Sequence, residues 1–297
     1  MAAEATRLDV AGASPRLSLG RAAVYALLAI FALYYLLPLY VVLATSFKPM
    51  DEVRDGNLLA LPQAWTVAPW LKAWGSACTG VDCRGLAPYF WNSMAMAVPA
   101  VLISTLIGAF NGYVLSLWRF RGSELLFALL LVGCFIPFQV VLLPMARVLG
   151  IVGLSNTTPG LIFVHVVYGM AFTTLFFRNF YLSVPEELIK AARIDGAGFF
   201  LIFRRIVLPL SGPIFVVSII WQFTQIWNDF LFGVSFNGGA AAPVTVALNN
   251  LVNTSTGVKE YNVDMAAAVI AALPTLVVYI VAGRYFVRGL TAGAVKG

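Results

Sequence analysis

Charged residues are scarce in this sequence. Asp, Glu, Lys and Arg together make up 11% of its 297 residues, while 61% of the residues are hydrophobic. An ordinary soluble domain has about 25% charged residues, and it has no core large enough for so much apolar surface. Composition therefore excludes a soluble enzyme, a disordered chain and a fibrous protein. The class that remains is an all-α polytopic membrane protein.

Side chains with catalytic chemistry are equally few. The sequence has one histidine and three cysteines, too few and too scattered for a zinc site. It contains no phosphate-binding loop of the G-x-x-x-x-G-K-[ST] pattern and no nucleophile–base–acid set. We therefore expect no metal, no cofactor bound by this chain and no enzyme activity of its own.

Long uncharged runs predict six transmembrane helices. The first run lies between Arg21 and Lys48, a stretch of 26 residues without a charge, and a span needs about 20 apolar residues. The expected spans cover residues 22–46, 91–117, 123–146, 157–177, 211–235 and 263–284. They form a membrane domain over residues 22–288, between an N-terminal tail (1–21) and a C-terminal tail (289–297).

The basic residues predict the orientation. An even number of spans puts both termini on one side, together with the loops 118–123 and 178–208. That side holds 13 of the 19 Lys and Arg residues, and cytoplasmic loops carry the excess of positive charge. We therefore expect both termini in the cytoplasm and the loop 47–90 outside. The net charge of +6 reflects this bias, so no nucleic-acid partner is expected.

One cytoplasmic loop, residues 178–210, contains two predicted short helices. Ser183 and Glu186 have the spacing of a capping box for the first helix. Glu186 and Lys190 are four residues apart in the favourable order for an ion pair. Gly196 is placed to end this helix in the left-handed conformation. The second helix covers residues 199–207 and ends at Leu208-Pro209. From the residues alone, the pair is either an interfacial amphipathic element or a docking site for a cytoplasmic protein.

This loop resembles the "EAA" loop of permease subunits of ATP-binding-cassette (ABC) importers. The matching residues are Ala191, Ala192, Asp195, Gly196, Ala197, Ile206, Leu208 and Pro209. The C-terminal residues 285–297 resemble the end of maltose-type (MalG-like) sugar permeases, and Trp227-Asn228-Asp229 and residues 264–268 also fit that subfamily. Lys190 departs from the family pattern, which has Glu at that position.

The resemblance implies a type I ABC importer permease in the cytoplasmic (inner) membrane. Such a chain pairs with a second permease, here expected as a heterodimer, to form the pore. Two ATPase subunits bind ATP and Mg, and an extracytoplasmic solute-binding protein delivers the sugar. The residues expected to couple to the ATPase are Glu186, Glu187, Lys190, Ala191, Ala192, Asp195, Gly196 and Ala197. The tail 289–297 is expected to reach into the ATPase pair, the alternative being a frayed end.

A polar stripe runs along the fifth expected span. Ser218, Gln222, Gln225 and Asp229 have offsets of 0, 4, 7 and 11 residues, so they share one helix face. Trp227 and Asn228 lie beside its end. A carboxylate in a span indicates a pathway, and amides, a carboxylate and indole rings also bind sugars. The alternative is polar contact between helices, worth about 0.6–2 kcal/mol for each contact.

Two further points remain open at this stage. Cys78 and Cys83 fall in the extracytoplasmic loop, where a disulfide persists; two free thiols are the alternative. Competing functions are an importer of another solute such as glycerol phosphate, a stand-alone ion-coupled transporter, and a scaffold without transport. An ion-coupled transporter would need paired ionisable groups in its spans, and the sequence offers Asp229 with no evident basic partner.

Overall fold

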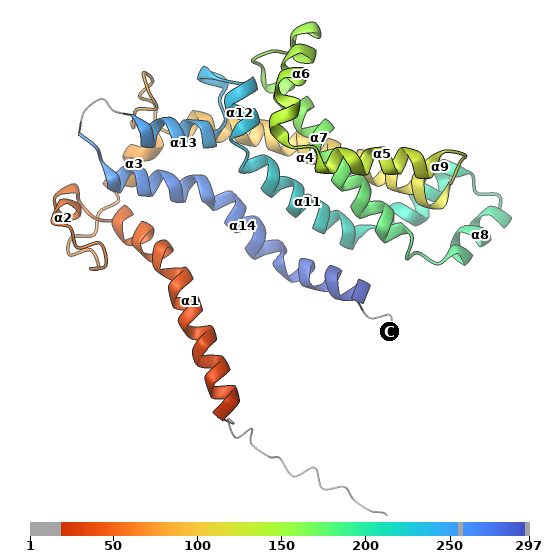
Figure 1. The fold of residues 1–297 in the computed structure, drawn as a ribbon, viewed down its shortest axis with the longest axis horizontal. Coiled ribbons are helices and arrows are strands. Elements are labelled where there is room, and N and C mark those ends of the chain that lie inside the picture. The colour runs from red at the N-terminus through yellow and green to blue at the C-terminus, as the bar shows by residue number, and fades with distance from the viewer. Residues whose placement is uncertain (1–18, 255–257, 295–297) are drawn as a thin grey trace, which may run out of the picture.

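All regular secondary structure is helical over the residues that the computed structural model describes, 19–254 and 258–294, with side chains described up to residue 283. This confirms the all-α prediction (Figure 1). Four helices are long and apolar enough to cross a bilayer: α1 (Leu19–Ser46), α4 (Ala87–Leu117), α7 (Thr158–Tyr181) and α14 (Tyr261–Ala294).

Two further crossings are built from bent pairs of helices. The first joins α5 (Ser123–Phe135) to α6 (Phe138–Ile151) at 106°. The second joins residues Phe199–Leu210 to α11 (Gly212–Trp227) at 75°. Six crossings result if each pair counts as one. The shorter elements are α2 (Met50–Arg54), α3 (Ala68–Gly75), α8 (Glu186–Ile194), α9 (Phe199–Ile202), the π-helical η1 (Phe203–Val207), α10 (Leu208–Leu210), α12 (Leu231–Phe236), the 3₁₀-helical η2 (Gly239–Ala241) and α13 (Val244–Asn253).

The third and fifth expected spans are not single straight helices. Pro137 precedes α6 and leaves Ile136 in an extended conformation (φ −69°, ψ 122°), because the residue before a proline avoids the helical region. Pro209, where the helix 199–207 was expected to end, lies within the helical stretch Phe199–Leu210, which is followed by the bend of 75° into α11. Helix α11 then ends at Trp227, eight residues before the expected end of the fifth span at 235.

Helices α4 and α7 form the centre of the bundle, and small residues let them approach closely. Gly108 and Gly112 on α4 face α7, where a Cβ at position 112 would lie 2.7 Å from the backbone nitrogen of Arg178. The hydroxyl of Thr173 donates to the carbonyl of Ser104 at 2.9 Å, which ties the two helices together. This is the small-xxx-small packing of membrane helices.

The two ends of the bundle carry different elements (Figure 1). Helix α8 lies at one end, while α3, α13 and the loop before α4 lie at the other. Helix α7 continues to Tyr181, so the loop expected from residue 178 begins at Leu182. Helix α1 diverges from the bundle, and its apolar side chains are exposed, as for a helix whose surroundings are apolar.

Candidate functional site

A cavity of about 540 Å³ opens where the two bent crossings meet α7. The helix breaks create it, because α5 ends at Phe135 and α11 ends at Trp227 on its borders. Its described lining residues are Cys134, Ile136, Phe138, His165, Tyr168, Gly169, Phe172, Trp221, Gln222, Thr224, Gln225, Ile226, Asn228, Asp229, Phe230, Leu231 and Phe232.

Gln222 is the most deeply buried polar side chain of this lining, with 1% of its surface exposed. Its amide packs against Gly169 of α7, where any Cβ would overlap the amide. Nε2 donates to the carbonyl of His165 at 3.5 Å, and Oε1 has no hydrogen-bond partner among the described residues. The lack of a side chain at position 169 therefore sets where the Gln222 amide lies.

Asp229 lies in the break between α11 and α12 and caps α12. Its carboxylate accepts hydrogen bonds from the backbone nitrogens of Phe232 (3.3 Å) and Gly233 (3.1 Å). The hydroxyl of Thr245 on α13 donates to the Asp229 carbonyl at 2.6 Å. This hydrogen bond holds the segment between α11 and α12 against α13. Nε2 of His165 is 3.7 Å from Oδ2 of Asp229, which gives the carboxylate a basic neighbour that the sequence did not reveal.

Aromatic rings cover the remaining walls of the cavity. Phe172 and Trp221 form one wall, with ring centroids 4.6 Å apart. Phe138 and Tyr168 form another at 4.8 Å, and Phe232 meets Tyr168 edge-on at 5.4 Å. Ring faces next to amide and carboxylate groups can bind a solute that presents both C–H faces and hydroxyls.

The predicted polar stripe divides into two groups. Gln222, Gln225, Asn228 and Asp229 line the cavity together. Ser218 and Trp227 do not: both are buried between helices, and the indole N–H of Trp227 donates to the carbonyl of Ala271 at 2.8 Å. For these two, contact between helices is the better description.

The cavity also contains residues that the sequence reasoning did not select. They are His165, Tyr168, Phe172, Trp221 and Cys134. Tyr168 and Phe172 lie three and seven residues after His165, so one face of α7 carried a usable signal. Trp221 carried a signal as well, because Gln225 and Asn228 follow it at offsets of four and seven residues on the same helix face. Cys134 had no such signal, since its place at the cavity depends on the break after α5.

Helix α8 has one buried and one exposed face. Ile189 and Ala192 pack under the ends of α4 and α7, among Tyr113, Phe177 and Tyr181. Arg193 fixes the helix further, because its guanidinium donates to the carbonyl of Leu117 at 3.3 Å and lies 4.4 Å from the ring centroid of Trp118. The exposed face carries Glu186, Glu187, Lys190, Ala191 and Ile194.

The local predictions for this loop are partly confirmed. Glu186 and Lys190 form the expected ion pair at 3.1 Å. Gly196 adopts a φ of +81° directly after the helix, as expected, with Asp195 exposed before it and Ala197 half-buried after it. The capping box is wrong: Ser183 donates to the carbonyl of Phe180 at 2.7 Å, and Pro185 precedes the helix without a side-chain cap. The expected helix 199–207 is α9 followed by the π-helical turn η1.

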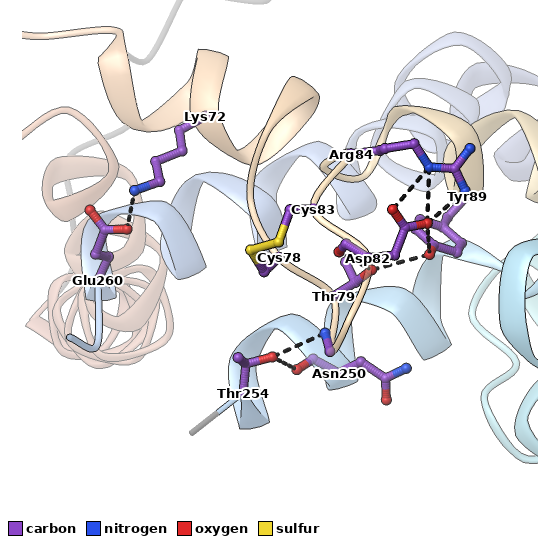
Figure 2. Close-up of a disulfide and its surroundings, with 11 residues drawn as sticks. Lys72, Cys78, Thr79, Asp82, Cys83, Arg84, Tyr89, Asn250, Thr254 and Glu260 are labelled. Carbon is purple, nitrogen blue, oxygen red and sulfur yellow. Dashed lines mark hydrogen bonds and ion pairs between the residues drawn. A yellow bond between two sulfur atoms is a disulfide. The ribbon is translucent and has the colours of Figure 1, made fainter. Parts of the chain in front are cut away.

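At the other end of the bundle, a disulfide joins Cys78 and Cys83 in the loop between α3 and α4 (Figure 2). Asp82 accepts from the Arg84 guanidinium at 2.6 and 2.9 Å and from the Tyr89 hydroxyl at 3.2 Å. The hydrogen bonds from Arg84 hold the pKa of Asp82 below its usual value. The loop also reaches α13, because Gly80 donates to Thr254 at 3.2 Å.

Comparisons with known proteins agree on one family. Residues 89–291 match the family model of the binding-protein-dependent transport system inner membrane component. The chain is 34% identical to the xylose/arabinose import permease XacI of Haloferax volcanii, over 96% of this chain and 97% of that protein. It is 31% identical to the diacetylchitobiose uptake permease NgcG of Streptomyces coelicolor, over 92% and 88%. A probable ABC transporter permease of Pyrococcus horikoshii is 47% identical over 60% of this chain and 65% of that protein.

Solved structures show the same fold. A chain of a bacterial ABC transporter that imports the acidic polysaccharide alginate superposes with a TM-score of 0.78 at 22% identity, over 92% of this chain and all of that chain. The methionine transporter MetNI gives a TM-score of 0.54 at 20% identity, over 69% and 95%. The chain therefore has an ABC importer permease fold.

Proposed function

This chain belongs to the family of binding-protein-dependent transport system inner membrane components, and from that premise we propose that it forms half of the pore of a sugar importer. It is a membrane permease and not itself an enzyme. The names of its relatives support a sugar as the solute, since full-length relatives import xylose and arabinose or diacetylchitobiose.

The transport complex has four further components in this proposal. A second permease completes the pore, and two ATPase subunits bind ATP and Mg and hydrolyse ATP. A solute-binding protein delivers the sugar on the extracytoplasmic side. Both termini are cytoplasmic, which the excess of basic residues on that side supports. Residues 295–297 of the C-terminal tail, for which contact with the ATPases is expected, lie outside the described residues.

The observation that carries the proposal is that α8 has one buried and one exposed face. Its inner face is anchored in the core by Ile189 and Ala192, so a displacement of α8 must move the ends of α4 and α7. Its outer face offers Ile194, which is 86% exposed, and the small side chain of Ala191. An exposed large apolar side chain beside a small one suits a protein partner. In this proposal, ATPase closure moves α8 and shifts the pore between two conformations.

Co-purification of the complete importer tests this function. We expect Ile194→Asp to lose the ATPase subunits and ATP-driven sugar uptake, while the second permease still co-purifies. Ile151→Asp is the matched control, because Ile151 is 77% exposed and lies in the loop expected on the opposite side of the membrane. A wild-type chain that purifies alone and still transports would contradict the proposal and favour an ion-coupled transporter.

A further inference from the structure

We propose that the cavity between α5, α7 and α11 is a sugar-binding subsite of this chain, and that it accepts uncharged sugars and rejects acidic ones. This inference rests on the proposed function and deepens it, because the solute is held by this chain's own residues rather than only passed along. Three observations carry it: unpartnered buried polar atoms, aromatic walls and the charge of the lining.

Two buried polar atoms of the cavity lack hydrogen-bond partners among the described residues. Oε1 of Gln222 and Nε2 of His165 are both buried and have no hydrogen bond within the described residues. Their side chains are 1% and 5% exposed, and both line the cavity. A buried polar atom without a partner costs about 1–3 kcal/mol. A hydroxyl group both donates and accepts, so a sugar at this position would satisfy both atoms.

The aromatic walls of the cavity suit the apolar C–H faces of a sugar. The rings of Phe172 and Trp221 on one side, and of Tyr168 on another, present apolar surface beside the amides of Gln225 and Asn228. A volume of about 540 Å³ is within the range of ligand pockets, about 300–1,000 Å³. The site thus combines hydroxyl-binding groups with ring surface for C–H faces.

The charge of the lining excludes acidic solutes. Asp229 is the one carboxylate among the described lining residues, and they include no Lys or Arg. A uronate or a sugar phosphate placed here would bring a second anion next to Asp229, where no Lys or Arg balances it and the His165 imidazole already faces the carboxylate at 3.7 Å. Burying an unpaired charge is costly, and like charges face to face reject a ligand. The glycerol phosphate alternative is disfavoured on the same ground.

Cys134 provides a direct readout of occupancy. It lines the cavity and is the free cysteine of the three in the sequence, since Cys78 and Cys83 form the disulfide. The purified importer, with both permeases and the ATPases, would be placed in lipid nanodiscs without binding protein. Maleimide modification of this chain is then followed by intact mass, with millimolar glucose, galactose, xylose, arabinose or maltose, and with glucuronate or galacturonate.

We expect at least one neutral sugar to slow modification of Cys134, and its uronate to have little effect at the same concentration. Asp229→Asn keeps a side-chain oxygen for the α12 amides and removes the charge. In that variant, uronate protection should approach that of the neutral sugar, on the order of a tenfold gain. Wild-type protection by uronate equal to that by the neutral sugar would overturn the inference.

A control distinguishes occupancy from a change in conformation. Phe135 is the next residue of α5, is 82% exposed and does not line the cavity. In a Cys134→Ser background, Phe135→Cys should show no protection by sugar. Equal protection at residue 135 would indicate movement of α5 rather than a filled cavity, and would also overturn the inference.

Uptake into proteoliposomes with the binding protein distinguishes failure of the subsite from failure of the proposed transport function. Uptake of a neutral sugar that does not protect Cys134 would refute the subsite and leave the proposed function standing. If no sugar is taken up by the complete importer, the proposed function fails, and the subsite fails with it.

Discussion

Nε2 of His165 on α7 lies 3.7 Å from Oδ2 of Asp229, in the break after α11. The two side chains come from different crossings, and the carboxylate also accepts two backbone hydrogen bonds from α12. Asp229 thus joins three elements around the cavity: it faces α7 through His165, ends α11 and caps α12. A solute that contacts this carboxylate would contact the break between α11 and α12.

Two substitutions at Asp229 separate its structural role from its role toward the solute. Asp229→Ala removes the cap of α12, and loss of a cap costs about 1 kcal/mol, so we expect a lower melting temperature together with reduced uptake. Asp229→Asn keeps a cap oxygen and should preserve the melting temperature. Scanning fluorimetry and uptake assays measure both effects. Normal transport by Asp229→Ala would remove this side chain from the pathway.

Gly169→Ala tests the placement of the Gln222 amide. The added methyl would overlap that amide, which is the far end of a flexible side chain and can move away. We expect little change in stability but weaker solute binding, seen as a higher KM for uptake or as less sugar protection of Cys134. Gly133→Ala is the matched control, since a Cβ there meets nothing within 4 Å. Equal effects of the two variants would exclude a specific role for Gly169.

Gly112→Ala tests the contact between α4 and α7. Its Cβ would meet the backbone of α7, 2.7 Å from the nitrogen of Arg178, and a backbone atom cannot rotate away. The helices must separate, so we expect a loss of about 1–3 kcal/mol, as for overpacked cores, seen as a lower melting temperature in detergent. Gly133→Ala again serves as the control. An unchanged melting temperature for Gly112→Ala would contradict this packing.

The sequence predicted the positions of the four long apolar helices, because long uncharged runs and the cost of burying charge in lipid decide them; the predicted six crossings are reached only if each bent pair counts as one. It also predicted the left-handed turn at Gly196 and the ion pair between Glu186 and Lys190, which depend only on neighbouring residues. These features follow from local chemistry, so one sequence suffices to find them.

The helix breaks and the cavity could not be predicted in the same way. Pro137 and Pro144 lie in the same expected span, yet Pro137 stands at the bend of 106° and Pro144 lies inside α6, because tertiary packing decides which proline bends the chain. The predicted pathway included Trp227, beside the end of the stripe, and left His165 out. Trp227 packs in the core, where its indole N–H donates to the carbonyl of Ala271 on α14, and only the packing of α7 against α11 brings His165 to the carboxylate.

The pH dependence of the extracytoplasmic loop should follow Asp82. Since Arg84 lowers the folded-state pKa of this carboxylate, the interaction stabilises the loop above the ordinary value of 3.8 and is lost as the pH falls through the lower folded value. Amide exchange of residues 79–86 should be faster in Arg84→Gln than in wild type at pH 5–7. The difference should vanish only below pH 3.8. A difference that already disappears near pH 5 would contradict the assignment.

The disulfide between Cys78 and Cys83 predicts the number of reactive thiols. Without reductant, maleimide should add one label to the denatured chain, at Cys134; after reduction it should add three, as counted by intact mass. A substitution of Cys78 by Ser frees Cys83 and should give two labels without reductant. Three labels on the unreduced wild-type chain would show that the two loop cysteines are free thiols. The loop would then be held by its hydrogen bonds, from Gly80 to Thr254 and from Arg84 to Asp82, and reductant should leave its amide exchange unchanged.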